Sequence, residues 1–211
     1  MPSEELFDVF DEQMAKIGVE TRENVHSQGL WHQTFHCWII NNSTKGELKL
    51  LLQLRHKDKD TFPDLLDTSC AGHLLTGESA ADGVRELQEE LGLYVSINEL
   101  HFCGTVAEES IISKDLIDRE FNHVFIYECN LPLSKYNFQT SEISGLFFIG
   151  FKQFKHLLNG EVNAIPSEGI MFDEMNGVMA NVRRDIVIDD FALYSIEYYD
   201  LLFNGIEKLY T

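Results

Sequence analysis

The sequence is poor in cysteine and in positive charge, and it has no long hydrophobic run. The four cysteines, Cys37, Cys70, Cys103 and Cys129, lie too far apart to predict a zinc knuckle or a redox pair. We therefore expect reduced thiols in a cytoplasmic protein. No apolar run approaches the roughly 20 residues that cross a bilayer, and the residues after Met1 do not resemble a secretory signal.

Negative charge dominates the composition. The chain has 35 acidic residues against 16 Lys and Arg, which gives a net charge of -19 at pH 7. Binding of DNA or RNA depends on Lys and Arg that neutralise phosphates, so this composition excludes nucleic acid as a partner. A small phosphorylated metabolite remains possible where metal ions or a few well-placed cations offset the local negative charge.

Strand patterns and helix patterns alternate along the 211 residues, and no repeat or linker divides them, so we predict one domain. Aromatic and β-branched residues predict strands at 31–42 and 47–54, joined into a hairpin by a turn at 41–46. Further extended segments are predicted at 4–11, 95–106, 120–129 and 147–149, and helices at 151–158 and 190–210. Interleaved strands and helices predict an α/β sandwich around a mixed β-sheet.

The most informative segment is a helix predicted at 81–91. Val84, Leu87 and Leu91 form one apolar stripe at helical spacing, and Gly92 is placed to end the helix. Such a stripe packs against a core. The opposite side of the helix is then free to carry a functional group.

Three carboxylates, Glu86, Glu89 and Glu90, lie on one side of this helix. Glu86 and Glu90 are one turn apart, roughly 6 Å along the axis, and Glu86 and Glu89 are also neighbours. Their charges repel unless a hard cation lies between them, and Mg²⁺ prefers oxygen ligands. A solvated acidic face offset by Arg85 is the alternative explanation.

The loop before the helix favours the metal site. Gly72 and Gly77 permit a tight loop that lets Glu78 fold back toward the helix. We therefore predict that Glu78, Glu86, Glu89 and Glu90 bind Mg²⁺.

This segment resembles the Nudix box, a Gly-x5-Glu-x7-Arg-Glu-apolar-x-Glu-Glu-x-Gly-apolar signature. The matching residues are Gly72, Glu78, Arg85, Glu86, Leu87, Glu89, Glu90, Gly92 and Leu93. Only six residues separate Glu78 from Arg85, where the family has seven, so the deletion has to be absorbed before the helix begins. The resemblance implies a Nudix-type α/β/α sandwich that cleaves diphosphates linked to another group, using Mg²⁺ or Mn²⁺.

The similarity extends over about residues 4–158, and it is to a Nudix subfamily related to isopentenyl-diphosphate isomerase. The segments 5–11, 25–32 and 69–73 carry this part of the resemblance. Residues 165–211 lie beyond it as a C-terminal extension, which we expect to pack on the domain, close the pocket or form a homodimer contact.

The isomerases use a cysteine directly before the Gly-His pair, facing a glutamate. Ala71 has the cysteine position here, Cys70 precedes it, and Glu120 matches the glutamate. Neighbouring side chains of an extended segment point to opposite faces, so we expect Cys70 to point away from the site. Because Ala71 stands at the position of the isomerase cysteine, we rank hydrolysis above isomerisation.

Four residues are predicted to bind substrate. Arg55 and Lys59 follow a strand, and the resemblance implies that they contact substrate phosphate, although an ordinary charged loop explains them equally well. His32 and His73, with His26, resemble positions near a metal site in the isomerase branch. Buried, hydrogen-bonded histidines are the alternative.

Together these residues predict a Mg²⁺-dependent Nudix hydrolase that cleaves a diphosphate linkage in a nucleoside diphosphate derivative or a related metabolite. Bound metal makes water a better nucleophile, and Glu89, Glu90 or Glu120 accepts its proton. Glu86 and Arg85 complete the predicted catalytic set. The alternatives are an isopentenyl-diphosphate isomerase-like enzyme and a catalytically weak ligand-binding Nudix domain, the latter motivated by the shortened loop.

Overall fold

The computed structural model describes residues 5–44 and 46–210. The strands are β1 (Leu6–Phe10), β2 (Lys16–Thr21), β3 (Trp31–Thr44), β4 (Glu47–Arg55), β5 (Leu66–Asp67), β6 (Cys70–His73), β7 (His101–Ser113), β8 (Leu116–Glu128), β9 (Ile143–Gly150), β10 (Ile165–Asp173) and β11 (Val178–Ile186). The helices are α1 (Arg22–Gln28), α2 (Arg85–Leu91), α3 (Phe151–Leu158) and α4 (Ile196–Tyr210).

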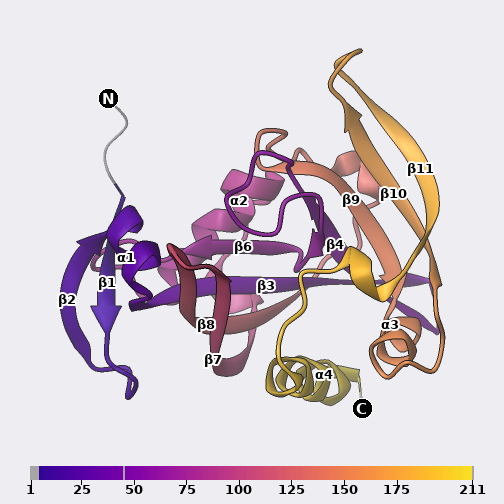
Figure 1. Ribbon diagram of the computed structural model, residues 1–211. Helices are drawn as coiled ribbons and strands as arrows, with labels where there is room; N and C mark the ends of the chain where they lie inside the picture. Colours follow the sequence, from indigo (N-terminus) through magenta and orange to yellow (C-terminus); the bar gives the residue numbers. More distant parts are fainter. Residues whose placement is uncertain (1–4, 45, 211) are drawn as a thin grey trace.

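The strands form one mixed sheet. Its main path runs β11-β10-β9-β4-β3-β1-β2, as Figure 1 shows. Strand β3 also pairs with β6 and, in parallel, with β8, whose other neighbour is β7. This arrangement confirms the predicted α/β class with a mixed sheet.

Helices cover both faces of the sheet, because β3 alternates its apolar side chains between two cores. Ile39 packs in the core that contains Leu87 of α2. Trp38 packs in the core that contains Phe154 of α3 and Leu202 of α4. The layers are therefore helix, sheet and helix, and α2 lies on the opposite face from α3 and α4.

The hairpin predicted from the first two strands is confirmed, with Ile40 opposite Leu50. Strand β3 continues to Thr44, so the turn is shorter than the predicted segment 41–46. Glu4, at the start of the predicted strand 4–11, lies outside the described residues, as does Lys45. The helix predicted at 151–158 is α3, whereas the tail becomes helical only at Ile196.

The sequence did not predict β2, α1 or the long hairpin of β10 and β11, which projects from one end of the sheet (Figure 1). Most residues of β11 are exposed or half-buried, since β11 is an edge strand. It therefore lacks the apolar alternation that marks a strand packed on a core. No helix in the described part of the chain is both long and apolar enough to cross a membrane.

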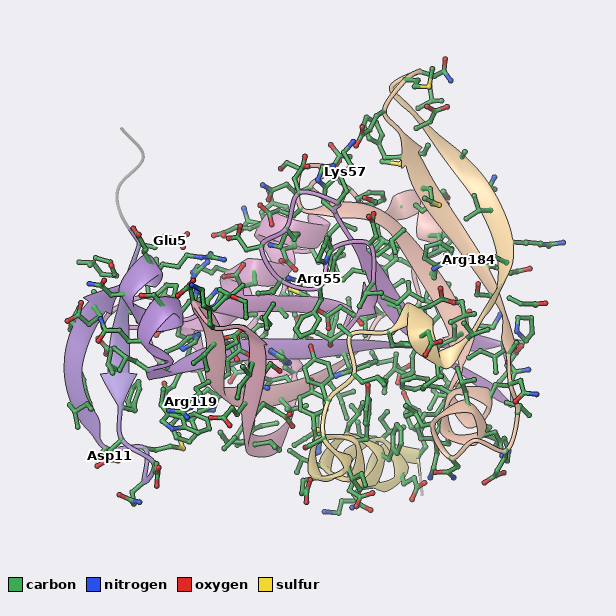
Figure 2. All side chains as sticks on the ribbon, viewed as in Figure 1. Glu5, Asp11, Arg55, Lys57, Arg119 and Arg184 are labelled. Carbon is green, nitrogen blue, oxygen red and sulfur yellow. The ribbon has the colours of Figure 1, made fainter. Side chains whose placement is uncertain are left out.

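Charged side chains mostly point outward, and one exception leads to the functional site. The side chain of Lys57 is 52% exposed, whereas that of Arg55, two residues earlier, is 12% exposed and lies within the molecule (Figure 2). A buried guanidinium needs partners, and the partners of Arg55 belong to the cavity described next.

Candidate active site

A tight turn leads the chain into α2. Residues Asp82–Val84 form a 3-10 helix that continues directly into Arg85. A 3-10 helix has about 3.0 residues per turn instead of 3.6, so a segment that is one residue short still reaches α2. Gly92 ends the helix in the left-handed conformation at a φ of 70°, which glycine adopts without strain.

The guanidinium of Arg85 organises the carboxylates around it. It donates to both carboxylate oxygens of Glu78 at 2.9 and 3.1 Å, to Glu86 Oε1 at 2.6 Å and to Glu89 Oε2 at 3.1 Å. It also donates to the backbone carbonyl of His73 at 2.9 Å. Hydrogen bonding to Arg85 holds the pKa of Glu78 below its usual value. In this structure Glu78 therefore orients Arg85, and its role as a metal ligand stays a prediction.

The Glu86 carboxyl packs directly against the backbone of Gly72. A Cβ at position 72 would lie 2.6 Å from Cγ of Glu86 and still closer to its carboxyl group. This approach requires glycine, which explains why the loop carries one at the start of the motif.

Burial raises the pKa of two of the α2 glutamates. Glu86 is 8% exposed and Glu90 is 7% exposed, whereas Glu89 is exposed. Burial raises the pKa of Glu86 to about 7, and burial together with the charge of Glu86 raises the pKa of Glu90 to about 8. A divalent cation beside them would offset this cost, because an opposite charge favours the ionised carboxylate.

A second cluster of candidate ligands lies beside the first. His26, His32, His73 and Asp118 each offer a ligand atom, and these four atoms lie within 4.8 Å of one another. The Nε2 atoms of the three histidines and Oδ1 of Asp118 are buried without a hydrogen-bond partner among the described residues. Buried polar atoms are rarely left unpaired, so this donor set fits a metal ion.

The ring geometry of His32 supports the same conclusion. Its Nδ1 lies 3.1 Å from the carbonyl of Leu30, which assigns the proton to Nδ1 and leaves Nε2 to accept. Burial lowers the pKa of His32 to about 3, so the ring is neutral, as a metal ligand must be. Phe7 stacks on His32 and His73 and fixes both rings.

Glu120 lies beside the histidine cluster. Its Oε1 lies 3.8 Å from Nε2 of His32 and 3.8 Å from Nε2 of His73. Burial and the charge of Asp118 raise its pKa well above the usual value. Asp118 and Glu120 are two residues apart on β8, so both point to the same face of the sheet.

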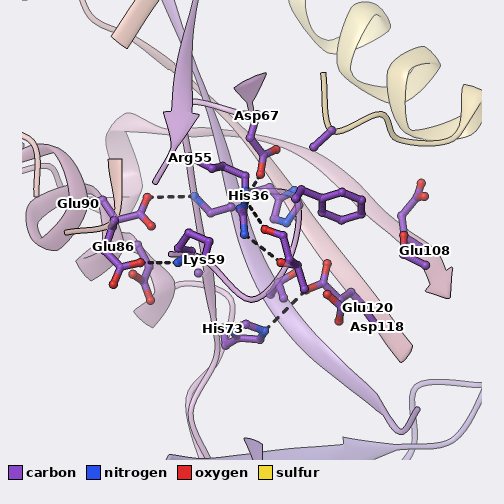
Figure 3. A pocket seen from close by; sticks show the side chains of 18 of the residues that line it. His36, Arg55, Lys59, Asp67, His73, Glu86, Glu90, Glu108, Asp118 and Glu120 are labelled. Carbon is purple, nitrogen blue, oxygen red and sulfur yellow. Dashed lines mark hydrogen bonds and ion pairs between the residues drawn. The ribbon is translucent and has the colours of Figure 1, made fainter. Parts of the chain in front are cut away.

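These groups line one cavity of about 540 Å³, a common size for a ligand site. Figure 3 shows Glu86 and Glu90 at one end of it and His73, Asp118 and Glu120 across from them. Of the ten residues predicted for the site, all line the cavity except His32, which lies behind His73. The lining contains ten carboxylates and four Lys or Arg residues, so a polyphosphate needs added cations to bind here.

Arg55 and Lys59 line the cavity but already have partners. Arg55 donates to Asp67 Oδ2 at 2.8 Å and to the carbonyl and hydroxyl of Thr61 at 3.0 and 2.9 Å. Lys59 pairs with Glu142. Binding of substrate phosphate by these two cations stays a prediction.

The sequence reasoning missed several lining residues, among them Asp67, Glu108, Asp118 and Tyr194. The alternation of Asp118 and Glu120 along one strand face was a readable signal for Asp118. Tyr194 had no such signal, since only the fold brings the C-terminal segment to the cavity.

Cys70 lies outside the cavity. It is fully buried in the core beneath α2, and burial raises the pKa of its thiol well above the usual value. Ala71, the next residue, lines the cavity. The isomerase cysteine position therefore holds a methyl group, as the sequence indicates.

Comparisons with known proteins identify the family to which this chain is similar. The NUDIX domain family model matches residues 30–166. An uncharacterized Nudix hydrolase of Clostridium acetobutylicum is 38% identical over 203 residues, which cover 96% of this chain and 97% of that protein. Isopentenyl-diphosphate Delta-isomerase 1 of Mesocricetus auratus is 29% identical and is matched over 80% of this chain and 81% of its own. A crystal structure from Deinococcus radiodurans shares the fold, with a TM-score of 0.54 at 22% identity, over 74% of this chain and 90% of that one.

Proposed function

The chain belongs to the Nudix family, and from that premise we propose that it is a divalent-metal-dependent hydrolase of diphosphate linkages in small phosphorylated metabolites. The observation that carries the proposal is the convergence of Glu86, Glu89 and Glu90 with Arg85 at the rim of an acidic cavity. Nucleoside diphosphate derivatives are the substrate class we expect.

Two groups of residues would hold metal in this proposal. The α2 glutamates would bind Mg²⁺, or Mn²⁺ in its place, through oxygen ligands. The cluster of His26, His32, His73 and Asp118 would bind a second divalent ion, for which its unpaired nitrogen atoms are suited. When bound, such ions stabilise charge on phosphoryl oxygens and make water a better nucleophile.

The protein's own residues would position and deprotonate the water. Its oxygen forms a bond to one phosphorus, the bond from that phosphorus to the bridging oxygen breaks, and the second phosphate leaves with the bridging oxygen. The proton of the water passes to Glu89, Glu90 or Glu120. Arg85 keeps Glu86 and Glu89 in place during this step through its hydrogen bonds.

Hydrolysis of ADP-ribose to AMP and ribose 5-phosphate, and of related diphosphates to their two monophosphate products, followed by mass spectrometry with Mg²⁺, tests the proposal. The variant Glu89→Gln/Glu90→Gln is expected to lose turnover. Its charge-matched control is Glu12→Gln/Glu99→Gln, because both of these residues are exposed and lie outside the cavity. Full turnover in the first variant would rule out the proposed site.

The histidine cluster favours one second candidate, an isopentenyl-diphosphate isomerase-like activity, since His26, His32 and His73 resemble positions near a metal site in that branch. The methyl group of Ala71 argues against it, because it cannot transfer a proton. Incorporation of deuterium into isopentenyl diphosphate without phosphate release would favour the isomerase. Tight binding of ADP-ribose without turnover under Mg²⁺ or Mn²⁺ would instead favour a ligand-binding Nudix domain.

A further inference from the structure

The wall of the cavity remote from α2 is built by β7 and by the segment 191–195, which we call the C-terminal strap. The strap lies along β5, where the backbone N–H of Ala192 donates to the carbonyl of Leu66 at 2.9 Å. Leu193 and Tyr194 of the strap line the cavity beside Glu108 of β7. This wall therefore depends on residues that lie far apart in the sequence.

Glu108 is held in place by the end of the strap. The hydroxyl of Ser195 donates to Glu108 Oε1 at 2.5 Å, and the backbone N–H of Ser195 lies 3.3 Å from both carboxylate oxygens. A carboxylate accepts about four hydrogen bonds, so Ser195 orients Glu108 without using its full capacity. No Lys, Arg or His of the described chain forms an ion pair with Glu108, although it lines the cavity.

Glu108 lies too far along the cavity to act together with the α2 glutamates, the proposed metal ligands. In Figure 3 it lies at the opposite end of the cavity from Glu86 and Glu90, with Asp118 and Glu120 between. A substrate whose diphosphate lies near α2 and Arg55 would extend its attached group toward Glu108. The attached group would then lie against the Glu108 carboxylate. A hydrocarbon group there would remove water from the charged carboxylate without replacing its hydrogen bonds, which costs free energy.

We infer that Glu108 is a specificity-determining residue that accepts a hydrogen bond from a hydroxyl of the group attached to the diphosphate. This inference rests on the proposed function and narrows its substrate class to hydroxylated rather than hydrocarbon diphosphates. A site built to bind a hydroxyl rejects the analogue that lacks it, since the acceptor positions of Glu108 that Ser195 leaves open are then covered without a donor.

Two matched series of probes test the inference: n-alkyl diphosphates, and the same esters with a terminal hydroxyl, at chain lengths from four to eight carbons, with ADP-ribose as a positive control. The ratio of kcat/KM values for hydroxylated and plain esters measures the preference. We expect the wild-type protein to favour the hydroxylated ester by about 10- to 100-fold at the chain length that reaches Glu108.

Variants of Glu108 test whether its carboxylate, and not a change in the fold, determines the preference. Glu108→Leu should abolish or invert the preference while both series are still cleaved, and Glu108→Gln should keep part of it through its remaining acceptor oxygen. Glu109→Ala is the control, because Glu109 is the next residue on β7, lies outside the cavity and pairs with Arg119. Thermal unfolding of each variant verifies that it is folded.

The outcomes distinguish the two proposals. Cleavage of both series at equal rates at every length, or a preference that survives in Glu108→Leu, would overturn the role of Glu108 and leave the hydrolase intact. Absence of cleavage of both series and of ADP-ribose would overturn the proposed function, and the inference with it.

Discussion

Replacing Gly72 by alanine should perturb the α2 glutamates, the proposed metal ligands, without removing any of them. The added methyl carbon would lie 2.6 Å from Cγ of Glu86, about 1 Å closer than an ordinary carbon–carbon contact. Because the new methyl group and the buried Glu86 side chain would overlap, the Glu86 carboxylate must be displaced by about that distance. We expect turnover to fall by about 100-fold, because a displacement near 1 Å at a catalytic group has that effect.

The cost to stability should be smaller than the cost to activity. Overpacking of this kind destabilises by about 1–3 kcal/mol, which thermal unfolding measures. Gly18→Ala is the matched control, since a Cβ at position 18 meets nothing within 4 Å. Hydrolysis of the diphosphate substrate by a folded Gly72→Ala variant at the wild-type rate would refute the claim that the position of Glu86 matters.

Three further predictions concern residues with distinct environments. Burial lowers the pKa of His36 to about 4, below its unfolded value near 6.5, so stability is lost as pH falls from about 6.5 toward 4. We therefore expect the free energy of unfolding, measured in urea, to decrease between pH 7 and pH 5 by about 2 kcal/mol less in His36→Gln than in the wild type. An equal decrease in both proteins would contradict this expectation. Cys70→Ala should cost about 1 kcal/mol of stability and lower diphosphate hydrolysis only slightly, because the thiol hydrogen-bonds Glu90 but lies outside the cavity; loss of turnover in a folded variant would place the thiol in the mechanism. Arg85→Lys should lower turnover by about tenfold or more because a lysine cannot reproduce the forked hydrogen bonds, and wild-type kinetics would show that Arg85 does not position the glutamates.

Local sequence patterns were sufficient for the elements that pack on the core. The apolar stripe of α2, its terminal Gly92 and the hairpin of β3 and β4 were all predicted, because each follows from the periodicity of buried side chains. The spacing of the glutamates along α2 also required only a helix. Most of the predicted site residues line one cavity.

The rest of the site depends on long-range pairing. His26, His32, His73 and Asp118 come from α1, β3, β6 and β8. Resemblance to the isomerase branch placed the three histidines near a metal site, but no local pattern indicates that the four ligand atoms converge. Glu108 meets Ser195 across 87 positions of the sequence. Such contacts follow from the order of strands in the sheet, which periodicity does not specify.

In the proposed enzyme, the carboxylates of α2 hold a divalent cation where a diphosphate can reach it. A crystal structure with Mn²⁺ and a methylene-bridged diphosphate analogue, analysed by anomalous diffraction at the manganese edge, tests this most directly. We expect an anomalous peak at metal–oxygen coordination distance from carboxylates of Glu86, Glu89 or Glu90, with a phosphate oxygen of the analogue as a further ligand. Manganese bound only at the histidine cluster, with the α2 carboxylates bound to no metal, would contradict it.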